Sequence, residues 1–348
     1  MQNPGELCRC CGCDIILDGT DETAGTGKGG NSVEKAYDIL CIGTALVDSI
    51  IRGFDPQPIS AAGYRAESGS LNVGGEAVNA AMAAAKLGMR TAILCSLGED
   101  AAGDMVVSAL RGAGVDTQLI RRPAGHPTPV TTMFVRADGS RRSVTNDAHR
   151  YNFHPERALG VLSRTRAVLL GSLFRAPFNE PEIIRAVLEE ARAQGVPVFA
   201  DTKLPNFRVL TLDDIADCLP LIDTITPNED EGRYYTGKSE ARDMARVFLD
   251  RGVKNVIVKL GGRGCFFKNA DTELSLPACP VRAVDATGAG DNFIAGYAAE
   301  LLRGAANERA LRFANACGAL CASAVGASAG LRDREQVLAF LKDMERNT

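Results

Sequence analysis

From Tyr37 onward, short apolar runs alternate with amphipathic segments along the chain. The apolar runs are rich in Val, Ile and Leu, which is typical of strands buried on both faces of a parallel sheet. They lie at Ile39–Ile42, Thr91–Ser96, Ala167–Leu170, Val196–Ala200, Thr224–Thr226 and Val256–Lys259. Helical spacing of apolar residues marks the segments Ala77–Leu87, Gly103–Gly112, Glu182–Gln194, Ser239–Arg251, Gly290–Leu302, Glu308–Ala324 and Arg334–Met344. This alternation predicts an α/β fold of three layers, a mostly parallel sheet with helices on both faces.

Two segments, residues 48–72 and 118–144, interrupt this rhythm. Within the second, Val130–Arg136 alternates like a half-exposed strand and is followed by the turn signal Asp138-Gly139. Ahead of the alternating region, residues 1–36 show no apolar periodicity, and Asp18–Asn31 is rich in Gly, Thr and Asp. We therefore expect a disordered or appended tail, followed by one domain over residues 37–345.

The composition narrows the function. The chain has 348 residues, enough for a large core, and a formal net charge of -4. That charge argues against a nucleic-acid-binding protein, whose surface would be basic. No apolar run approaches the roughly 20 residues that span a bilayer, and the N-terminus lacks the apolar core of a signal peptide. We expect a cytoplasmic protein with no membrane partner.

Of the 11 cysteines, five are expected to be small apolar core residues: Cys41, Cys95, Cys265, Cys317 and Cys321. Cys8, Cys10, Cys11 and Cys13 are the exception, because they cluster in the predicted tail. Their spacing is tighter than that of paired zinc ligands, and no second pair follows nearby. A zinc site and a tail with reactive thiols both remain open interpretations.

The segment Gly288-Ala289-Gly290-Asp291 is the strongest chemical signal. Apolar residues after Asp291 recur at helical spacing, so the three small residues should stand at a helix N-terminus. Unpaired amides and the helix dipole attract a phosphate there, and Asp291 could take a proton from an attacking hydroxyl. A glycine-rich turn in which Asp291 only caps the helix remains the alternative.

A second cluster, Gly74-Gly75-Glu76-Ala77-Val78-Asn79, leads into an Ala-rich segment. Together the two clusters resemble the signatures of the ribokinase-like (PfkB) carbohydrate kinase family. The first signature fits from Gly74 to Gly98 and the second from Asp285 to Gly296. The pattern departs at Ala286, where Thr, Ser, Pro or Val is usual, but that side chain is not a catalytic group in the family.

The resemblance implies that residues 48–72 and 118–144 form a small β lid over a sugar site, and a homodimer through that lid is an associated expectation. It also implies the binding residues. The sugar would contact Asp48, Gly74, Gly75, Asn79 and Asp291. The nucleotide would contact Asn228, Lys259, Gly261, Gly264, Asn315 and Ala319. Asp291 would be the general base, with the anion hole at Gly288, Ala289 and Gly290.

Two metal sites follow from the same resemblance. Asn228 and Glu231 match the Asn-x-x-Glu that organises Mg²⁺ through water, although both also suit a helix N-terminus. A monovalent cation, K⁺, would be held by Asp285 and Thr287 with backbone near Ala324, Gly326 and Ser328. The cofactors implied are therefore ATP, Mg²⁺ and K⁺.

These features predict ATP-dependent phosphorylation of a hydroxyl, a primary one, on a small sugar or sugar derivative. A nucleoside kinase of the same fold and a catalytically silent sugar- or nucleotide-binding regulatory protein are the alternatives. An NAD-dependent oxidoreductase is disfavoured, because the first strand is followed by Gly43 without a Gly-x-Gly-x-x-Gly motif.

The acceptor is less defined than the reaction. The segment Gly171–Phe174 lacks the acidic residue expected in the ribokinase branch, which disfavours ribose. Four basic residues leave two interpretations open: they bind an anionic sugar together, or they are solvated surface charges. They are Arg141, Arg142, Arg175 and Lys203.

Overall fold

The computed structural model describes residues 35–53, 63, 65–136, 140–146, 154–206 and 208–346. All of them belong to one compact unit, Glu34–Thr348. The cysteine cluster at residues 8–13, nearly all of the predicted tail and the predicted turn at residues 138–139 lie outside the described residues. None of the helices in the described part of the chain is long and apolar enough to cross a bilayer.

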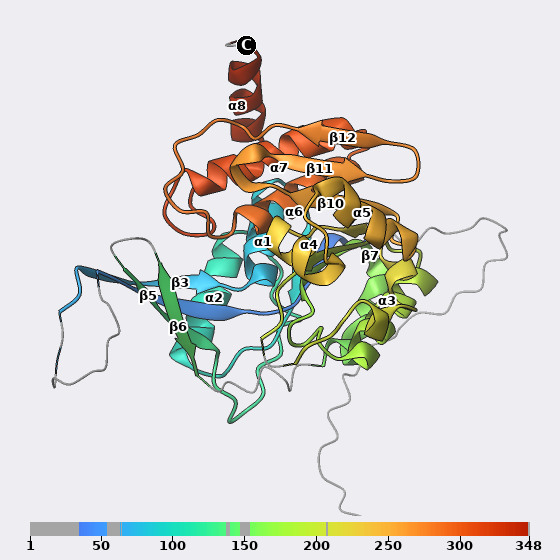
Figure 1. Ribbon diagram of the computed structural model, residues 1–348. Coiled ribbons are helices and arrows are strands. Elements are labelled where there is room, and N and C mark those ends of the chain that lie inside the picture. Colours follow the sequence, from blue (N-terminus) through green and yellow to red (C-terminus); the bar gives the residue numbers. More distant parts are fainter. Residues whose placement is uncertain are drawn as a thin grey trace, which may run out of the picture. The chain divides into compact units, whose positions relative to one another are not determined.

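An eight-stranded sheet lies at the centre, with the strand order β12-β11-β10-β9-β8-β7-β1-β4 (Figure 1). Its strands are β1 (Tyr37–Ile42), β4 (Thr91–Leu94), β7 (Thr165–Leu173), β8 (Val198–Thr202), β9 (Thr224–Ile225), β10 (Asn255–Lys259), β11 (Cys265–Lys268) and β12 (Glu273–Leu276). Neighbours from β4 to β10 pair in parallel, whereas β11 and β12 form an antiparallel edge. The mostly parallel sheet is confirmed. The sequence analysis does not predict the β11–β12 hairpin.

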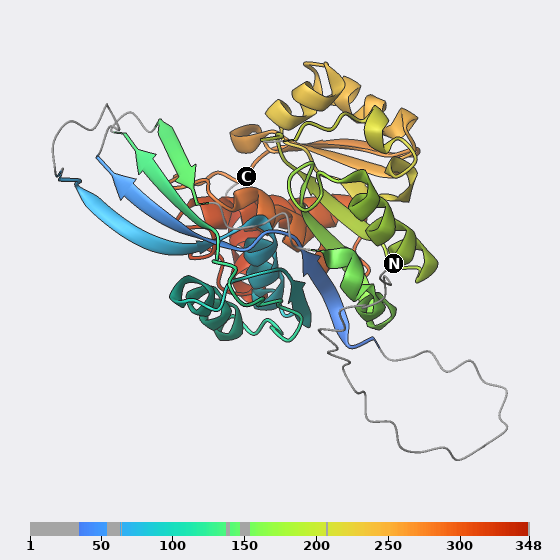
Figure 2. The ribbon, with the colours of Figure 1, turned by 90° about the horizontal axis from the view of Figure 1, so that it is seen from below.

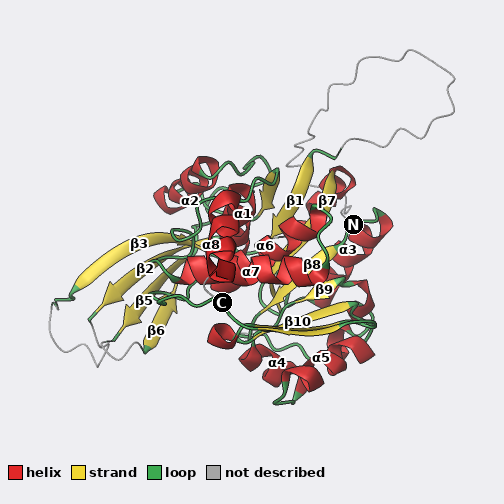
Figure 3. Ribbon diagram, turned by 90° about the horizontal axis from the view of Figure 1, so that it is seen from above, coloured by secondary structure: helices red, strands yellow, loops and turns green. Residues whose placement is uncertain are grey.

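Helices cover both faces of this sheet (Figure 3). One face packs against α1 (Glu76–Lys86), α2 (Ala101–Gly112), α6 (Ala289–Leu302), α7 (Asn307–Ala322) and α8 (Arg334–Arg346). The other packs against α3 (Pro181–Ala193), α4 (Glu229–Thr236) and α5 (Ala241–Asp250). Alternate residues of β1 divide accordingly: Ile39 and Cys41 join the first apolar core, and Leu40 and Ile42 join the second. The side-chain period of a strand therefore produces the predicted three layers.

A second sheet of four strands, the lid sheet, lies to one side of the main sheet in each view (Figure 2). Its strands are β2 (Leu46–Arg52), β3 (Ser68–Gly74), β5 (Val130–Val135) and β6 (Arg141–Thr145), in the order β3-β2-β5-β6. The stretch before Val130 belongs elsewhere, because Arg121 N–H donates to Cys95 O at 2.9 Å beside the main sheet. The lid sheet thus takes only β5 and β6 from this region, beginning at Val130, whereas the sequence predicts a lid segment that begins at residue 118.

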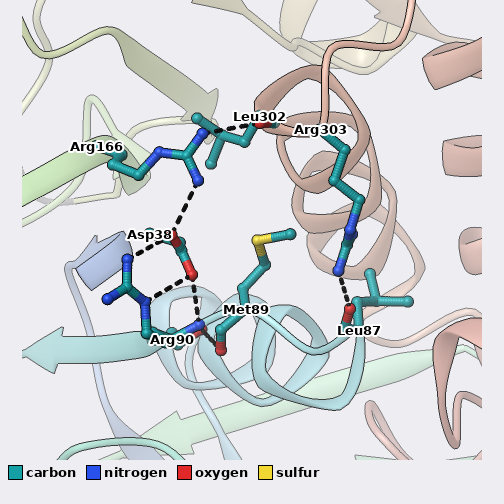
Figure 4. Close-up of polar contacts among 8 residues, drawn as sticks. Asp38, Leu87, Met89, Arg90, Arg166, Leu302 and Arg303 are labelled. Atoms are coloured by element: carbon teal, nitrogen blue, oxygen red, sulfur yellow. Dashed lines mark hydrogen bonds and ion pairs between the residues drawn. The ribbon is translucent and has the colours of Figure 1, made fainter. Parts of the chain in front are cut away.

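A buried carboxylate joins three elements at the amino ends of the strands (Figure 4). Asp38 of β1 accepts hydrogen bonds from Arg90 Nε at 3.2 Å and from Arg166 Nη1 at 3.0 Å. Arg166 also donates to Leu302 O at the end of α6, at 2.8 Å. Burial opposes the charge, but the bonds from Arg90 and Arg166 hold the pKa of Asp38 at about 2. This ion network fixes β1, β7 and α6 relative to one another.

Candidate active site

The site helices α1 and α6 both begin at a glycine in the left-handed region. Gly75 caps α1 with φ 99°, and Gly288 caps α6 with φ 77°. A Cβ on Gly75 would lie 2.4 Å from Thr44 O, and one on Gly288 would lie 2.5 Å from Ala327 Cβ. Only glycine satisfies both the backbone angle and the close packing. The two glycine clusters of the sequence therefore set where these helices start.

The two helices place Asn79 against Asp291. Asn79 Nδ2 donates to Asp291 Oδ2 at 2.8 Å, and both side chains are buried. Burial raises the pKa of Asp291 to about 7, an effect that Lys203 and the bond from Asn79 counteract. Asn79 Oδ1 is buried without a hydrogen-bond partner among the described residues. The pair thus offers a carboxyl whose raised pKa makes it a better proton acceptor than an exposed Asp, and an acceptor oxygen available to a ligand.

The predicted anion hole lies directly before Asp291. The first amides of a helix lack intrahelical acceptors, and those of Gly290 and Asp291 occupy such positions in α6. The amide of Ala289 differs from the expectation, because it donates to Ala286 O at 3.2 Å. Lys259 extends to this point, since a Cβ on Gly290 would lie 3.1 Å from Lys259 Nζ. Backbone donors and an ammonium group therefore converge at the helix end, as an anion site requires.

A pocket of about 420 Å³ opens beside this helix end. It brings together five of the six predicted nucleotide residues, Lys259, Gly261, Gly264, Asn315 and Ala319, and adds Ala289 and Gly290 from the predicted anion hole. Asn228, the sixth, is not among the residues that line it. Its remaining lining residues are Gly262, Ala278, Cys279, Pro280, Val281, Ala283, Ala286, Phe293, Gly318 and Ala322. A mostly apolar wall that ends at an anion site suits a flat base joined to phosphates.

Asp48 and Gly74 meet in the lid sheet. Asp48 of β2 pairs with Asn72 of β3, two residues before Gly74. A Cβ on Gly74 would lie 2.4 Å from Asp48 Oδ2, so the carboxylate needs a glycine at this position. Burial, with a smaller contribution from Glu76, raises the pKa of Asp48 to about 6. The lid sheet therefore supplies a carboxyl that hydrogen-bonds hydroxyls well.

Sequence reasoning missed an ion pair in this region. Lys203 Nζ lies 3.4 Å from Glu76 Oε1, and Glu76 is the first residue of α1. Lys203 is thus not a solvated surface charge, and Arg175 is also engaged, because its Nε donates to Leu204 O at 2.6 Å. The side chain of Arg141 is outside what the structure describes. The position of Glu76 between Gly75 and Asn79 was the signal available in the sequence.

The predicted Mg²⁺ residues form a capping box at the start of α4. Asn228 Oδ1 accepts from Glu231 N–H at 2.9 Å, and Glu231 Oε2 accepts from Asn228 N–H at 2.9 Å. Thr202 Oγ1 also donates to Glu231 Oε2, at 2.8 Å. Burial raises the pKa of Glu231. The pair is therefore compatible with both interpretations, a helix cap and a Mg²⁺ site. The capping box still leaves the buried carboxylate of Glu231 beside the carboxyl end of β8.

Asp201 stands beside these residues and was not predicted. It accepts from Thr226 Oγ1 at 2.7 Å and pairs with Lys259. Within the described ranges, no group of three or more His, Cys, Asp and Glu side chains is arranged to hold a metal ion. Any cation here would keep water or substrate oxygens as ligands.

The predicted K⁺ residues lie in two loops that bond to each other. Asp285 Oδ1 accepts from Thr287 N–H at 3.1 Å and from Thr287 Oγ1 at 2.7 Å, and Oδ2 accepts from Gly326 N–H at 3.2 Å. The carbonyl of Ser328 accepts from Lys86 Nζ. Protein donors thus occupy several of the oxygens that K⁺ would need.

Four features occur together here: a parallel sheet covered on both faces, a glycine-capped helix that carries a buried Asp, an adjacent pocket and the lid sheet. This combination defines a phosphotransferase with an alcohol acceptor. A protein-family model for pfkB family carbohydrate kinases matches residues 37–334. The chain belongs to this family, and it is a carbohydrate kinase.

Individual relatives agree with that assignment. The ribokinase of Arabidopsis thaliana is 30% identical over 87% of this chain and 81% of its own length. The structure of Arabidopsis thaliana ribokinase complexed with ribose and ATP superposes with a TM-score of 0.78 and 28% identity, covering 88% of this chain and 99% of that one. An Escherichia coli protein assigned as ribokinase II, in complex with ATP and Mg²⁺, gives a TM-score of 0.73 at 25% identity, covering 88% and 99%.

Proposed function

We propose that this protein transfers the γ-phosphoryl group of ATP to a hydroxyl, a primary one, of a small sugar or sugar derivative, with Asp291 as the general base. The observation that carries the proposal is the bond from Asn79 to Asp291. It places the carboxyl between the α1 end, which adjoins the lid sheet, and the α6 end, which adjoins the pocket of about 420 Å³. An acceptor hydroxyl on one side would then face a phosphate on the other.

Asp291 has a defined proton to move. The acceptor oxygen forms a bond to the γ-phosphorus while the bond from that phosphorus to the β–γ bridging oxygen breaks, and ADP leaves. The proton of the acceptor hydroxyl passes to the Asp291 carboxylate. Asn79 orients this carboxylate, while Lys259 and the amides at Gly290 and Asp291 stabilise negative charge on the phosphoryl oxygens.

The residues near Lys259 fit a magnesium ion. Asp201 and Glu231 are buried carboxylates at the carboxyl ends of β8 and at the start of α4, and hard oxygen ligands suit Mg²⁺. Two carboxylates are too few for an all-protein cage, which matches an ion that retains water and phosphate oxygens. When bound, Mg²⁺ supplies neutralisation of charge on the phosphates. Glu231, oriented by Thr202 and Asn228, would hold it through water.

K⁺ does not fit the loops in their present arrangement. Asp285 is already bonded to Thr287 and Gly326, and Ser328 O already accepts from Lys86. The role that these contacts support for Asp285 is to join the 285–287 loop to the 326–328 loop ahead of α6. We therefore derive no step through K⁺, and comparing turnover in potassium and choline salts tests the family expectation directly.

The lid sheet supplies the acceptor side of the site. Asp48 of β2 lies against Gly74 at the end of β3, and Gly74 directly precedes Gly75, the residue that caps α1. Closure over the acceptor would exclude water, which otherwise competes for the phosphoryl group. A homodimer through this sheet remains a proposal, and sedimentation equilibrium of the full chain tests it.

The direct test is an ADP-release screen with Mg²⁺ over neutral sugars, sugar acids, sugar phosphates and nucleosides. The proposal expects ADP formation that depends on one class of sugar, with one phosphorylated product in equal amount. Product analysis by ³¹P NMR then identifies the hydroxyl. ADP formation without a phosphorylated product from any acceptor would contradict the proposal.

A further inference from the structure

We propose that the ammonium group of Lys86 takes the place of the monovalent cation that the family resemblance implies, and that it holds residues 326–331 against the start of α6. Lys86 is the last residue of α1, and its Nζ donates to Ser328 O and, at 3.0 Å, to Leu331 O. Ser328 belongs to the backbone that is expected to bind K⁺. An ammonium group carries the same single charge as K⁺ and also binds carbonyl oxygens. The chain thus brings a cation of its own to this position.

Asp285, the carboxylate that is expected to bind K⁺, faces a second side-chain cation. Arg52 ends β2 of the lid sheet, and its Nη2 lies 4.0 Å from Asp285 Oδ2. The same oxygen accepts from Gly326 N–H at 3.2 Å, and the other carboxylate oxygen accepts from Thr287 Oγ1 at 2.7 Å. The charge of this buried carboxylate is therefore balanced by a guanidinium group and by hydrogen bonds within the protein. Less of it is left for a bound ion to neutralise.

Residues 326–328 are bonded to the first turn of α6. Asn292 Nδ2 donates to Ala327 O at 2.9 Å and to Gly288 O at 2.8 Å, so one side chain joins the loop to the helix cap. Gly288 also packs directly against Ala327. A shift of Ala327 would therefore move the amides that form the predicted anion hole. Lys86 binds the next residue along this loop, so it is a positioning residue for the phosphate site, a role that rests on the proposed binding of ATP there.

The position of Lys86 favours a fixed positive charge. Burial lowers the pKa of Lys86, and Cys321 acts in the opposite direction. The two carbonyl acceptors and the carboxyl-terminal end of α1 also favour the charged form. A simpler role for Lys86 is a helix-end contact that only adds stability. The two roles differ in their response to salt, because only a lysine that replaces a cation leaves a vacant cation site when it is removed.

The test measures the Kd for ATP with Mg²⁺ by calorimetry on the full chain, in potassium chloride and in choline chloride of equal ionic strength. The wild type should bind ATP equally in both salts, within about twofold. Lys86→Ala removes the ammonium group and opens its space, so ATP affinity should fall at least about tenfold in choline chloride and recover in potassium chloride. Lys86→Arg should remain insensitive to K⁺. Lys342→Ala, at an exposed position of α8, should match the wild type. The Tm, which needs no nucleotide, should follow the same pattern.

A wild type whose ATP affinity rises with K⁺ overturns the inference. So does Lys86→Ala if it binds ATP like the wild type in choline chloride, or if K⁺ does not improve its weakened binding, which is the result expected of a purely stabilising contact. If Lys86→Ala does not fold, the wild type decides: equal affinity in the two salts supports the role, and a gain with K⁺ refutes it. These measurements need no acceptor. A wild type that phosphorylates no acceptor thus refutes the proposed function, while the salt comparison still reports on Lys86.

Discussion

Asn79 and Asp291, 212 positions apart in the chain, are joined by a buried hydrogen bond of 2.8 Å from Nδ2 to Oδ2. Each residue lies in the first turn of a helix that a left-handed glycine initiates. The helices run side by side, because Arg303 at the end of α6 donates to Leu87 O at the end of α1, at 2.6 Å (Figure 4). The two sequence motifs therefore converge on one proton acceptor.

Replacing Asn79 tests this convergence. Asn79→Ala removes a hydrogen bond to a charged group, which is worth about 1.5–3 kcal/mol, so kcat should fall roughly 10- to 100-fold. Asn79→Asp should raise the pKa of the base further, because two adjacent carboxyls resist ionising together. The acid limb of the pH profile should then move to higher pH. A kcat within twofold of wild type in both variants would show that the bond plays no part in turnover.

Gly74→Ala should impair the acceptor side alone. The added Cβ would lie 2.4 Å from Asp48 Oδ2 and displace that carboxyl. The KM for the sugar should therefore rise by at least about tenfold, since a charged hydrogen bond to substrate is lost, while the Kd for ATP stays within twofold. Gly112→Ala is the matched control, because a Cβ at the end of α2 meets nothing within 4 Å. An unchanged sugar KM would remove Asp48 from the acceptor site.

Ala319→Phe should impair the nucleotide side alone. Ala319 lines the pocket of about 420 Å³, and a benzyl group there occupies space that a base would need. Calorimetry should show ATP binding weakened by at least about tenfold, the cost of a lost apolar contact of roughly 1.4 kcal/mol. Ala101→Phe, at an exposed position of α2, is the control. Equal ATP affinity in the two variants would place the nucleotide elsewhere.

Asp38 predicts a pH-dependent stability. Its folded pKa of about 2 lies below the ordinary value near 3.9, so its contribution is complete above about pH 4 and is lost as the pH falls towards 2. Because Arg90 and Arg166 are partly exposed, we expect Asp38→Asn to lower the free energy of unfolding by about 1–2 kcal/mol at pH 7.

Urea unfolding of Asp38→Asn and wild type across pH 2–7 measures that loss, and the difference between them should shrink below about pH 4. Asp230→Asn, which removes an exposed pair with Arg233, should cost little at any pH. A difference that stays constant down to pH 2 would contradict the low pKa of Asp38.

The sequence predicted those parts of the molecule that have a local cause. β1 was recognisable because both of its faces are buried, and Asp291 because small residues precede a helical period. The Glu76–Lys203 pair had no local signal beyond the position of Glu76 between Gly75 and Asn79, since its partners come from distant segments. The left-handed conformation of Ser172 was equally hidden, because surrounding contacts impose it. The tail, the cytoplasmic location, the lack of a nucleic-acid partner and the dimer stay predictions.

The central claim is that Asp291 takes the proton of the acceptor hydroxyl. Asp291→Asn keeps the side-chain shape and removes the basic oxygen, so the decisive measurement is sugar-dependent ADP formation by this variant at saturating ATP and acceptor, with ATP affinity measured in parallel. The account predicts a kcat lower by on the order of 10²- to 10⁴-fold with ATP affinity within a few-fold of wild type. Turnover close to the wild-type rate would contradict it.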